Sequence, residues 1–259
     1  MPYAELADVR LYYERAGTGP RLLVVNGSGS DLRRQPNAFS WPVASRFDVL
    51  TYDHRGLGRS DPAEAERQPT MVDFAADALG LVDDAGWDRF AVIGVSFGGM
   101  VAQELAILAG ARIDRLVLAC TSSGGAGGAS YPLHELSALP LEQRAEHMVG
   151  IMDTRAAHDE ELRAALLSWM RQAGDGVAGA GFERQLAARS RHDTSARLGA
   201  IVAPTLVAAG RYDGIAPVPN SEALAKGIPG ARLAVFEGGH AFFVQDPTAW
   251  PTMIGFLDS

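Results

Sequence analysis

Short apolar runs separated by amphipathic stretches dominate this chain. The runs are four to six residues long and are rich in Val, Leu, Ile, Ala and aromatic residues. They predict strands at residues 10–14, 22–25, 47–52, 90–93, 116–119, 205–209 and 233–236. Several of them show no alternation of apolar and polar positions, which indicates strands buried on both faces of a mostly parallel sheet.

Patterns with helical spacing lie between the predicted strands. They cover residues 71–85, 97–108, 221–226 and 250–257. Thr70 is expected to cap the first of these helices, with Asp73 at its third position. Strands that alternate with helices predict an α/β fold with a doubly wound, mostly parallel sheet flanked by helices.

One stretch interrupts this alternation. Residues 122–130 have the Gly, Ser and Ala composition of a flexible linker. The pattern that follows is helical, most clearly at 141–152 and 160–171, and contains no convincing strand. The parallel sheet is expected to resume at residues 201–205.

The helical stretch divides the chain into two predicted domains. Residues 1–121 and 198–259 are expected to form the α/β core. Residues 122–197 are expected to form a helical cap, or lid, inserted between two core strands and lying over one edge of the sheet.

Composition narrows the class of protein. The chain has 259 residues, 47% of them hydrophobic, which is enough for a large core, and a formal net charge of −8, which argues against a nucleic-acid partner. Its single cysteine, Cys120, excludes an intrachain disulfide and fits a reducing compartment.

Residues 1–5 lack the features of a secretion signal, and no apolar run approaches the roughly 18 residues of a membrane helix. We therefore expect a cytoplasmic protein with no membrane partner. No pattern indicates an oligomeric state.

The most informative motif is Gly94-Val95-Ser96-Phe97-Gly98-Gly99, which lies between a predicted strand and a predicted helix. Strand, Gly-x-Ser-x-Gly and helix in this order form a nucleophile elbow, in which a sharp turn exposes the serine hydroxyl. Gly94 and Gly98 fit such a turn because glycine tolerates positive φ and close backbone approach. The motif predicts Ser96 as a nucleophile.

A serine hydroxyl needs a neighbouring base, and the base needs a group that orients it. Asp213 and His240 each follow a later predicted strand, so the parallel sheet brings both to the edge that carries Ser96. The predicted catalytic residues are therefore Ser96, Asp213 and His240, with His240 as base and Asp213 as its orienting carboxylate. Asp193 is a poorer alternative because no strand precedes it.

The negative oxygen of a tetrahedral intermediate needs hydrogen-bond donors. We predict the backbone N–H groups of Phe97 and of Ser28, in the loop Asn26-Gly27-Ser28-Gly29, as the oxyanion hole. The mechanism needs no metal and no organic cofactor. No phosphate-binding glycine motif is present, so nucleotide binding has no support.

These motifs resemble the α/β-hydrolase superfamily along nearly the whole chain outside the helical stretch. Residues 94–99 are similar to its nucleophile elbow, residues 52–61 to the turn after its fourth strand, and residues 26–29 to its His-Gly-x-Gly oxyanion loop. Asn26 stands where the family usually has histidine, so the hydrogen bonds of this loop are expected to differ. The resemblance is to the branch of enol-lactonases, cofactor-free haloperoxidases and small esterases.

The resemblance implies a serine hydrolase that acts on esters or lactones of small, rather apolar molecules. Three alternatives remain open. The same three side chains serve C–C bond hydrolases and cofactor-free haloperoxidases or perhydrolases, and some relatives are small-molecule receptors that keep a hydrolase pocket. Haloalkane dehalogenases and epoxide hydrolases use an aspartate nucleophile, which Ser96 contradicts.

Other conspicuous residues have structural interpretations. His54 is expected not to be catalytic, and its neighbours Arg55 and Asp61 are expected to brace a turn through buried hydrogen bonds or an ion pair. Cys120 is expected to be a small buried residue. The histidines of the helical stretch and its edge match no metal site, and for most of them we expect solvent exposure; these are His134, His147, His158 and His192. Packing of cap helices against the core is the favoured role of Met148, Met152, Trp169 and Met170, with lining of an apolar pocket as the alternative.

Overall fold

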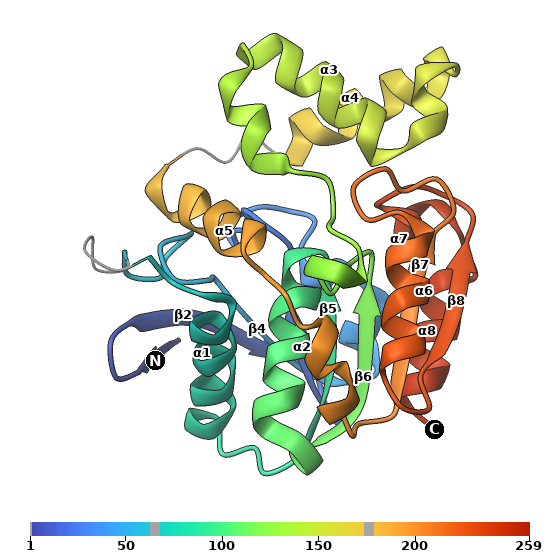
Figure 1. Ribbon diagram of the computed structural model, residues 1–259. Helices are drawn as coiled ribbons and strands as arrows, with labels where there is room; N and C mark the ends of the chain where they lie inside the picture. The colour runs from blue at the N-terminus through green and yellow to red at the C-terminus, as the bar shows by residue number, and fades with distance from the viewer. Residues whose placement is uncertain (1, 63–67, 174–178) are drawn as a thin grey trace.

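A single eight-stranded sheet organises the chain. The computed structural model describes residues 2–62, 68–173 and 179–259. Its strands lie in the order β1-β2-β4-β3-β5-β6-β7-β8 (Figure 1). The strands are β1 (Tyr3–Glu5), β2 (Arg10–Ala16), β3 (Arg21–Val25), β4 (Asp48–Tyr52), β5 (Phe90–Val95), β6 (Ile113–Ala119), β7 (Thr205–Gly210) and β8 (Arg232–Phe236). Strands β3 to β8 run parallel to one another, whereas β2 pairs antiparallel with both of its neighbours, β1 and β4.

Every strand predicted from the apolar runs is present. The three-residue edge strand β1 is additional, because it is too short to produce an apolar pattern. Strand β7 begins at Thr205, as the apolar run at 205–209 predicts. The sheet does not resume at residue 201, where it was expected to. Pro204, directly before it, lacks an N–H group and cannot donate to a sheet ladder.

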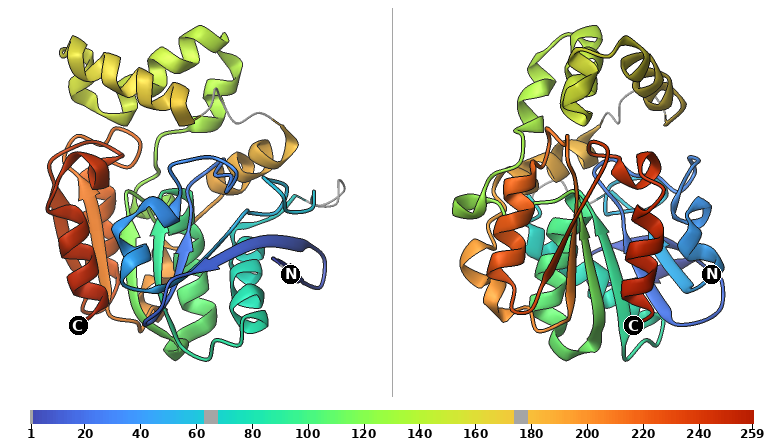
Figure 2. Two further views of the ribbon diagram at one scale, coloured as in Figure 1. Left: turned by 180° about the vertical axis from the view of Figure 1, so that it is seen from behind. Right: turned by 90° about the vertical axis from the view of Figure 1, so that its right-hand side faces the viewer.

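Helices cover both faces of the sheet (Figure 2). They are α1 (Met71–Asp84), α2 (Phe97–Ala109), α3 (Leu141–Met152), α4 (Glu160–Ala173), α5 (Ala180–Ser190), α6 (Val218–Gly227), α7 (Phe242–Gln245) and α8 (Ala249–Leu257). Buried side chains of α1, α2 and α6 share one apolar core with the sheet, and those of α7, α8 and two short 3₁₀ helices, Ala38–Ser40 and Pro42–Ser45, share the other. The predicted doubly wound α/β fold is confirmed.

Helix α1 begins as its sequence indicates. The Thr70 hydroxyl accepts from the Asp73 N–H at 3.3 Å, and the Asp73 carboxylate accepts from the Thr70 N–H at 2.7 Å, a reciprocal capping box. Buried Asp77 then receives two hydrogen bonds of 2.6 Å from Arg55. This ion pair ties α1 to the turn after β4, whereas Asp61 pairs separately with Arg10.

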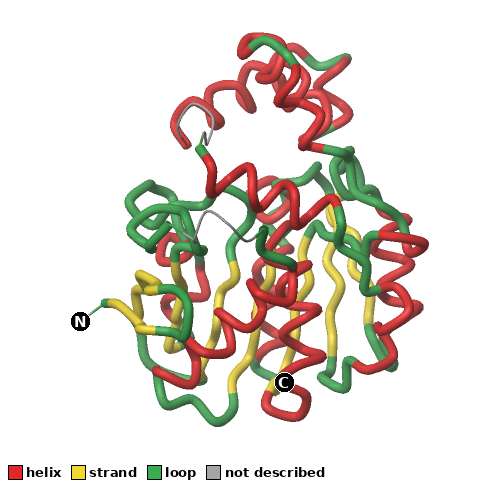
Figure 3. The backbone as a smooth tube through the Cα atoms, turned by 60° about the vertical axis from the view of Figure 1, so that its left-hand side comes forward, coloured by secondary structure: helices red, strands yellow, loops and turns green. Residues whose placement is uncertain are grey.

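Helices α3, α4 and α5 all lie between β6 and β7 in the sequence, and α3 and α4 stand above the carboxyl ends of the strands (Figures 1 and 3). Helix α5 runs across the same end, closer to the sheet. The predicted helices at 141–152 and 160–171 are present, and α5 is additional. Part of the predicted cap, residues 174–178, lies outside the described residues.

The segment at residues 122–130, predicted as a flexible linker, begins with three buried residues, 122–124, whereas residues 125, 126 and 129 are exposed. Gly124 bridges to Asp193, and the Thr194 N–H donates to the Ser123 carbonyl at 2.9 Å. A Cβ on Gly127 would lie 2.0 Å from the Ser123 hydroxyl. The glycines permit close packing where the chain leaves and rejoins the core.

None of the helices in the described ranges is long and apolar enough to cross a membrane.

Candidate active site

Ser96 lies at the turn between β5 and α2, in a strained conformation. Its φ is 55° and its ψ is −116°, a region that few residues other than glycine adopt. Such strain costs about 1–3 kcal/mol and persists only where the surroundings enforce it. The turn carries the Ser96 hydroxyl beyond the carboxyl end of β5.

Two glycines enforce this turn through close contact. A Cβ on Gly94 would lie 2.5 Å from the Gly98 carbonyl oxygen, and a Cβ on Gly98 would lie 2.0 Å from the Val25 carbonyl oxygen. Neither glycine has a positive φ. The motif therefore needs glycine for close packing of β3, β5 and α2, while Ser96 itself takes the strained conformation.

The structure brings Ser96, His240 and Asp213 together. The His240 Nε2 lies 2.9 Å from the Ser96 Oγ, and the His240 Nδ1 lies 2.8 Å from the Asp213 Oδ2. A carboxylate only accepts hydrogen bonds, so Nδ1 carries the proton and Nε2 is free to accept one from Ser96. The other Asp213 oxygen accepts from the N–H groups of Ile215 and Ala216 at 2.8 and 2.9 Å. The arrangement is that of a nucleophile, its base and an orienting acid.

The C-terminal end of α3 is hydrogen-bonded to the loops that carry Asp213 and His240. The Met152 carbonyl accepts from the His240 N–H at 2.6 Å, and the Ile151 carbonyl accepts from the Gly214 N–H at 2.9 Å. A Cβ on Gly239 would lie 2.1 Å from the Met152 carbonyl oxygen. The glycines before His240 thus permit close approach to this segment.

Buried Asp153 extends the same connection through side chains. Its carboxylate accepts from Arg155 at 2.7 Å and from the Gln245 amide at 3.0 Å. The Gln245 carbonyl oxygen in turn accepts from the Gly239 N–H at 2.8 Å. The backbone beside His240 is therefore held from two sides.

The loop that contains Ser28 lies against the turn that carries Ser96. A Cβ on Gly27 would lie 3.6 Å from the Ser96 Cβ, which places this loop against the turn. The Phe97 N–H is the first of α2 and has no acceptor within the helix. The Gly29 N–H is occupied by the Gln185 side chain at 2.8 Å, and no described residue accepts from the Ser28 N–H. Two backbone donors are thus available next to Ser96.

Asn26 replaces the usual histidine with a different set of contacts. The side-chain amide of Asn26 donates to the Thr51 hydroxyl at 2.8 Å. The backbone carbonyl oxygen of Asn26 lies 3.1 Å from the His54 Nε2. Complete burial lowers the pKa of His54 to about 4, so the ring is neutral and donates through Nε2. His54 packs edge-on against Phe97, and it therefore braces the oxyanion loop from below.

Of the other residues singled out in the sequence, some lie as expected and others do not. His192 is buried, contrary to the expected exposure, because the chain turns inward after α5. Asp193 accepts from Ser195 and has no contact with His240. Met148, Met152 and Trp169 pack around Ile215 and Ala241, and Met170 packs between α3 and α4. Cys120 is buried, as expected.

Sequence analysis missed the polar residues of α5 and the Asp153 network. Gln185, Arg189 and His192 are spaced by four and three residues, which is the signal of one helical face. All three are buried. Asp153 and Gln245 carry no local signal, because their partners lie far away in the sequence. Across residues 2–62, 68–173 and 179–259, no group of three or more His, Cys, Asp or Glu residues could hold a metal ion.

Comparison with known proteins assigns the family. Residues 20–168 match the alpha/beta hydrolase fold family. The chain is 31% identical to the rhodomycin D methylesterase DnrP of Streptomyces peucetius, over 93% of each chain. It is 28% identical to 2-hydroxy-6-oxo-6-phenylhexa-2,4-dienoate hydrolase of Comamonas testosteroni, over 91% of this chain and 86% of the other.

Solved structures agree with the sequence comparisons. The enol-lactonase from Burkholderia xenovorans LB400 superposes with a TM-score of 0.82 at 25% identity, over 100% of both chains. The chain therefore belongs to the α/β-hydrolase fold family, and it is a hydrolase.

The glycine contacts at the elbow predict a large effect of a single methyl group. Gly98→Ala is expected to lower the free energy of unfolding by several kcal/mol, because the added Cβ would collide with backbone atoms of β3. Gly255→Ala is the matched control, since nothing lies within 4 Å of its Cβ position in α8. It should stabilise the protein by about 0.5–1 kcal/mol. Urea unfolding measures both, and equal stabilities would contradict the packing argument.

The buried histidines predict a loss of stability in acid. Burial lowers the pKa of both His54 and His192 to about 4, from the ordinary histidine value of 6.5. Between pH 6.5 and 4 the unfolded chain binds protons that the folded chain excludes, so stability falls as the pH falls. Each histidine contributes roughly 3 kcal/mol over this window at about 1.4 kcal/mol per pKa unit.

His54→Gln should flatten this dependence, because one of the two histidines no longer titrates. Urea unfolding at a series of pH values, on the wild type and the variant, provides the comparison. Parallel curves for the two proteins would contradict the assignment to His54.

Proposed function

We propose that this protein is a serine hydrolase that cleaves carboxylic esters or lactones of small, mostly apolar molecules through an acyl-enzyme on Ser96. The observation that carries the proposal is the continuous chain of hydrogen bonds from Ser96 through His240 to Asp213, with distances of 2.9 and 2.8 Å. Its support from comparison is the likeness to a methylesterase and to an enol-lactonase.

In the first half of the reaction, His240 Nε2 takes the proton of Ser96 as Oγ attacks the substrate carbonyl carbon. Asp213 stabilises the imidazolium that forms. The N–H groups of Phe97 and Ser28 donate to the developing oxyanion, each contributing about 3 kcal/mol. The intermediate then collapses, and His240 returns the proton to the leaving alcohol.

In the second half, water replaces the alcohol. His240 takes a proton from the water, and the resulting hydroxide attacks the acyl-enzyme carbonyl carbon. Ser96 leaves with the proton from His240, and the carboxylic acid is released. No step requires a metal or an organic cofactor.

Two domains share this task in our proposal. Residues 1–121 and 198–259 form the α/β core that carries the reacting groups. Residues 122–197 form the cap that covers them and selects the substrate. Support comes from the described helices α3 and α4 above the strand ends, and from the hydrogen bonds of residues 151 and 152 to the loops of Asp213 and His240.

Cleavage of a carbon–carbon bond is the second candidate. The same three side chains serve both reactions, and the relative from Comamonas testosteroni is named for a dienoate hydrolase. A panel of short-chain esters, lactones and ring-cleavage dienoates separates the candidates by their kcat/KM. Tight binding of panel members without turnover of any would contradict both and favour a receptor.

Substitution tests the nucleophile and its orienting group. Ser96→Ala should abolish hydrolysis of a 4-nitrophenyl ester and labelling by a fluorophosphonate probe, because it removes the hydroxyl that is hydrogen-bonded to His240 Nε2. Asp213→Asn should lower kcat by about 10⁴-fold through the wrong imidazole tautomer.

The matched control is Ser40→Ala, which changes an exposed serine in a 3₁₀ helix and should retain wild-type rates. Labelling that persists in Ser96→Ala would remove Ser96 from its role.

A further inference from the structure

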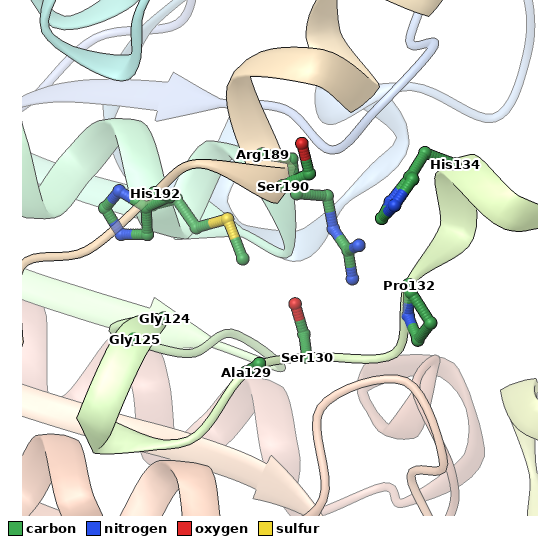
Figure 4. A pocket seen from close by; sticks show the side chains of 10 residues that line it. Gly124, Gly125, Ala129, Ser130, Pro132, His134, Arg189, Ser190 and His192 are labelled. Atoms are coloured by element: carbon green, nitrogen blue, oxygen red, sulfur yellow. The ribbon is translucent and has the colours of Figure 1, made fainter.

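A cavity of about 110 Å³ lies between α2, the loop after β6 and the end of α5 (Figure 4). Because one water occupies roughly 30 Å³ in the liquid, the cavity has room for a few waters or one small polar group. Met100 contributes an apolar wall, and Ser130, Arg189 and His192 contribute polar atoms. The Arg189 side chain extends into the space between Ser130 and His134 in this view.

Arg189 is a buried cation that lacks an anionic partner among the described residues. Arg189 is 6% exposed, and its Nη1 donates to the Tyr131 carbonyl at 2.6 Å. Its Nε is buried without any hydrogen-bond partner, and no carboxylate of the described residues forms an ion pair with it. Burial lowers its pKa to about 10, so it remains charged near neutral pH. The Asp213 carboxylate stabilises this charge at a distance but accepts no hydrogen bond from it, so the buried Nε stays unsatisfied. A buried guanidinium without a direct anionic partner is costly, which indicates that a further anion completes the site.

Arg55 is a buried arginine with a structural role, and its contacts provide a comparison for Arg189. Arg55 donates from Nε and Nη2 to both oxygens of Asp77 at 2.6 Å. In Arg189 the same Nε–Nη2 edge meets no carboxylate of the described residues. This edge is the one that takes a planar carboxylate through two parallel hydrogen bonds.

His192 adds a second incomplete group to the same cavity. It is 5% exposed, and neither of its ring nitrogens has a hydrogen-bond partner within the described part of the chain. Burial lowers its pKa to about 4, so the ring is neutral and carries one N–H donor. Two unsatisfied groups facing one small cavity form a site built for a hydrogen-bond acceptor.

The cavity adjoins the candidate active site. Met100 follows Ser96 by four residues on α2, which is about 6 Å along the helix axis. Gln185, one turn before Arg189 on α5, accepts from the Gly29 N–H of the oxyanion loop. Tyr131, which accepts from Arg189, donates through its own N–H to the Ile215 carbonyl beside Asp213. These connections place the cavity close enough to Ser96 for one molecule to reach both Arg189 and the nucleophile.

We propose that this cavity is a carboxylate-binding subsite, and that Arg189 makes the enzyme specific for esters or lactones that carry a free carboxylate a few bonds from the scissile carbonyl. The single guanidinium and the small volume fit a monoanionic carboxylate better than a larger, more highly charged group. The inference rests on hydrolysis at Ser96 and narrows its substrates to mostly apolar molecules with one acid group.

The test compares two esters that differ in one charged group, 4-nitrophenyl hexanoate and the mono-4-nitrophenyl ester of adipic acid. Wild-type enzyme should have the higher kcat/KM on the adipate ester, after subtraction of the uncatalysed rate. In Arg189→Met the ratio of adipate to hexanoate kcat/KM should fall roughly ten- to a hundredfold, mainly through KM, because a charge-assisted contact is lost. Arg189→Lys should recover part of the ratio.

Arg191→Met is the matched control, because Arg191 is exposed two residues further along and should leave the ratio at the wild-type value. Fluorophosphonate labelling of every variant reports that Ser96 and its base remain assembled. An equal ratio in wild type and Arg189→Met, with labelling intact, would overturn the proposed subsite.

A second measurement separates this inference from the proposed function. Calorimetric titration of adipate into the wild type and Arg189→Met requires no turnover. Saturable adipate binding that Arg189→Met abolishes supports the subsite, even if neither ester is hydrolysed. Absence of hydrolysis would contradict the proposed ester chemistry and leave the subsite standing. Absence of adipate binding to the wild type, together with equal ester ratios, overturns the subsite while hydrolysis at Ser96 stands.

Discussion

The arrangement of the whole site depends on one close-packed turn, in which Ser96 adopts a strained backbone conformation. Ser96 adopts a positive φ of 55°, and the cost is sustained by contacts that leave no room for a side chain at Gly94 or Gly98. Those contacts join β3, β5 and α2, which are the elements that carry the oxyanion loop and the first amides of the helix. The same packing therefore exposes the hydroxyl and brings backbone donors beside it. Because these positions come from backbone packing, they need little rearrangement when charge develops during a reaction.

A second constraint comes from the C-terminal end of α3 and the residue after it. Residues 151–153 contact the loops of Asp213 and His240 through backbone hydrogen bonds, and Asp153 reaches Gln245 and Arg155 through its side chain. Arg155 in turn lies 4.2 Å from the ring centre of Tyr212. The loops that carry the acid and the base are thus not supported by the sheet alone. Any displacement of α3 would act directly on the orientation of the imidazole.

The polar groups around the site divide into satisfied and unsatisfied sets. Both oxygens of Asp213 and both nitrogens of His240 have partners. Arg189 Nε, both nitrogens of His192, the amide nitrogen of Gln185 and the hydroxyl of Ser28 are buried without partners in the described residues. The satisfied set is preorganised for proton transfer. The unsatisfied set lies on α5, at His192 just after it, and on the oxyanion loop, where a molecule bound in the proposed subsite would supply the missing acceptors.

Local patterns in the sequence determined the strands, most of the helices, the nucleophile elbow and the order of the three candidate catalytic residues. Apolar runs and steric requirements at glycines act over a few residues, so they are visible without a structure. Long-range contacts decided the rest. Residues 122–130 resemble a linker in composition, yet residues 122–124 are buried where Asp193 and Thr194 return to meet them. The burial of His192, the support of His240 and the incomplete contacts of Arg189 depend on distant parts of the chain. Asp153 and Gln245, for example, are 92 residues apart in the sequence. Such features are properties of which surfaces the folded chain brings together, and only the tertiary structure decides that.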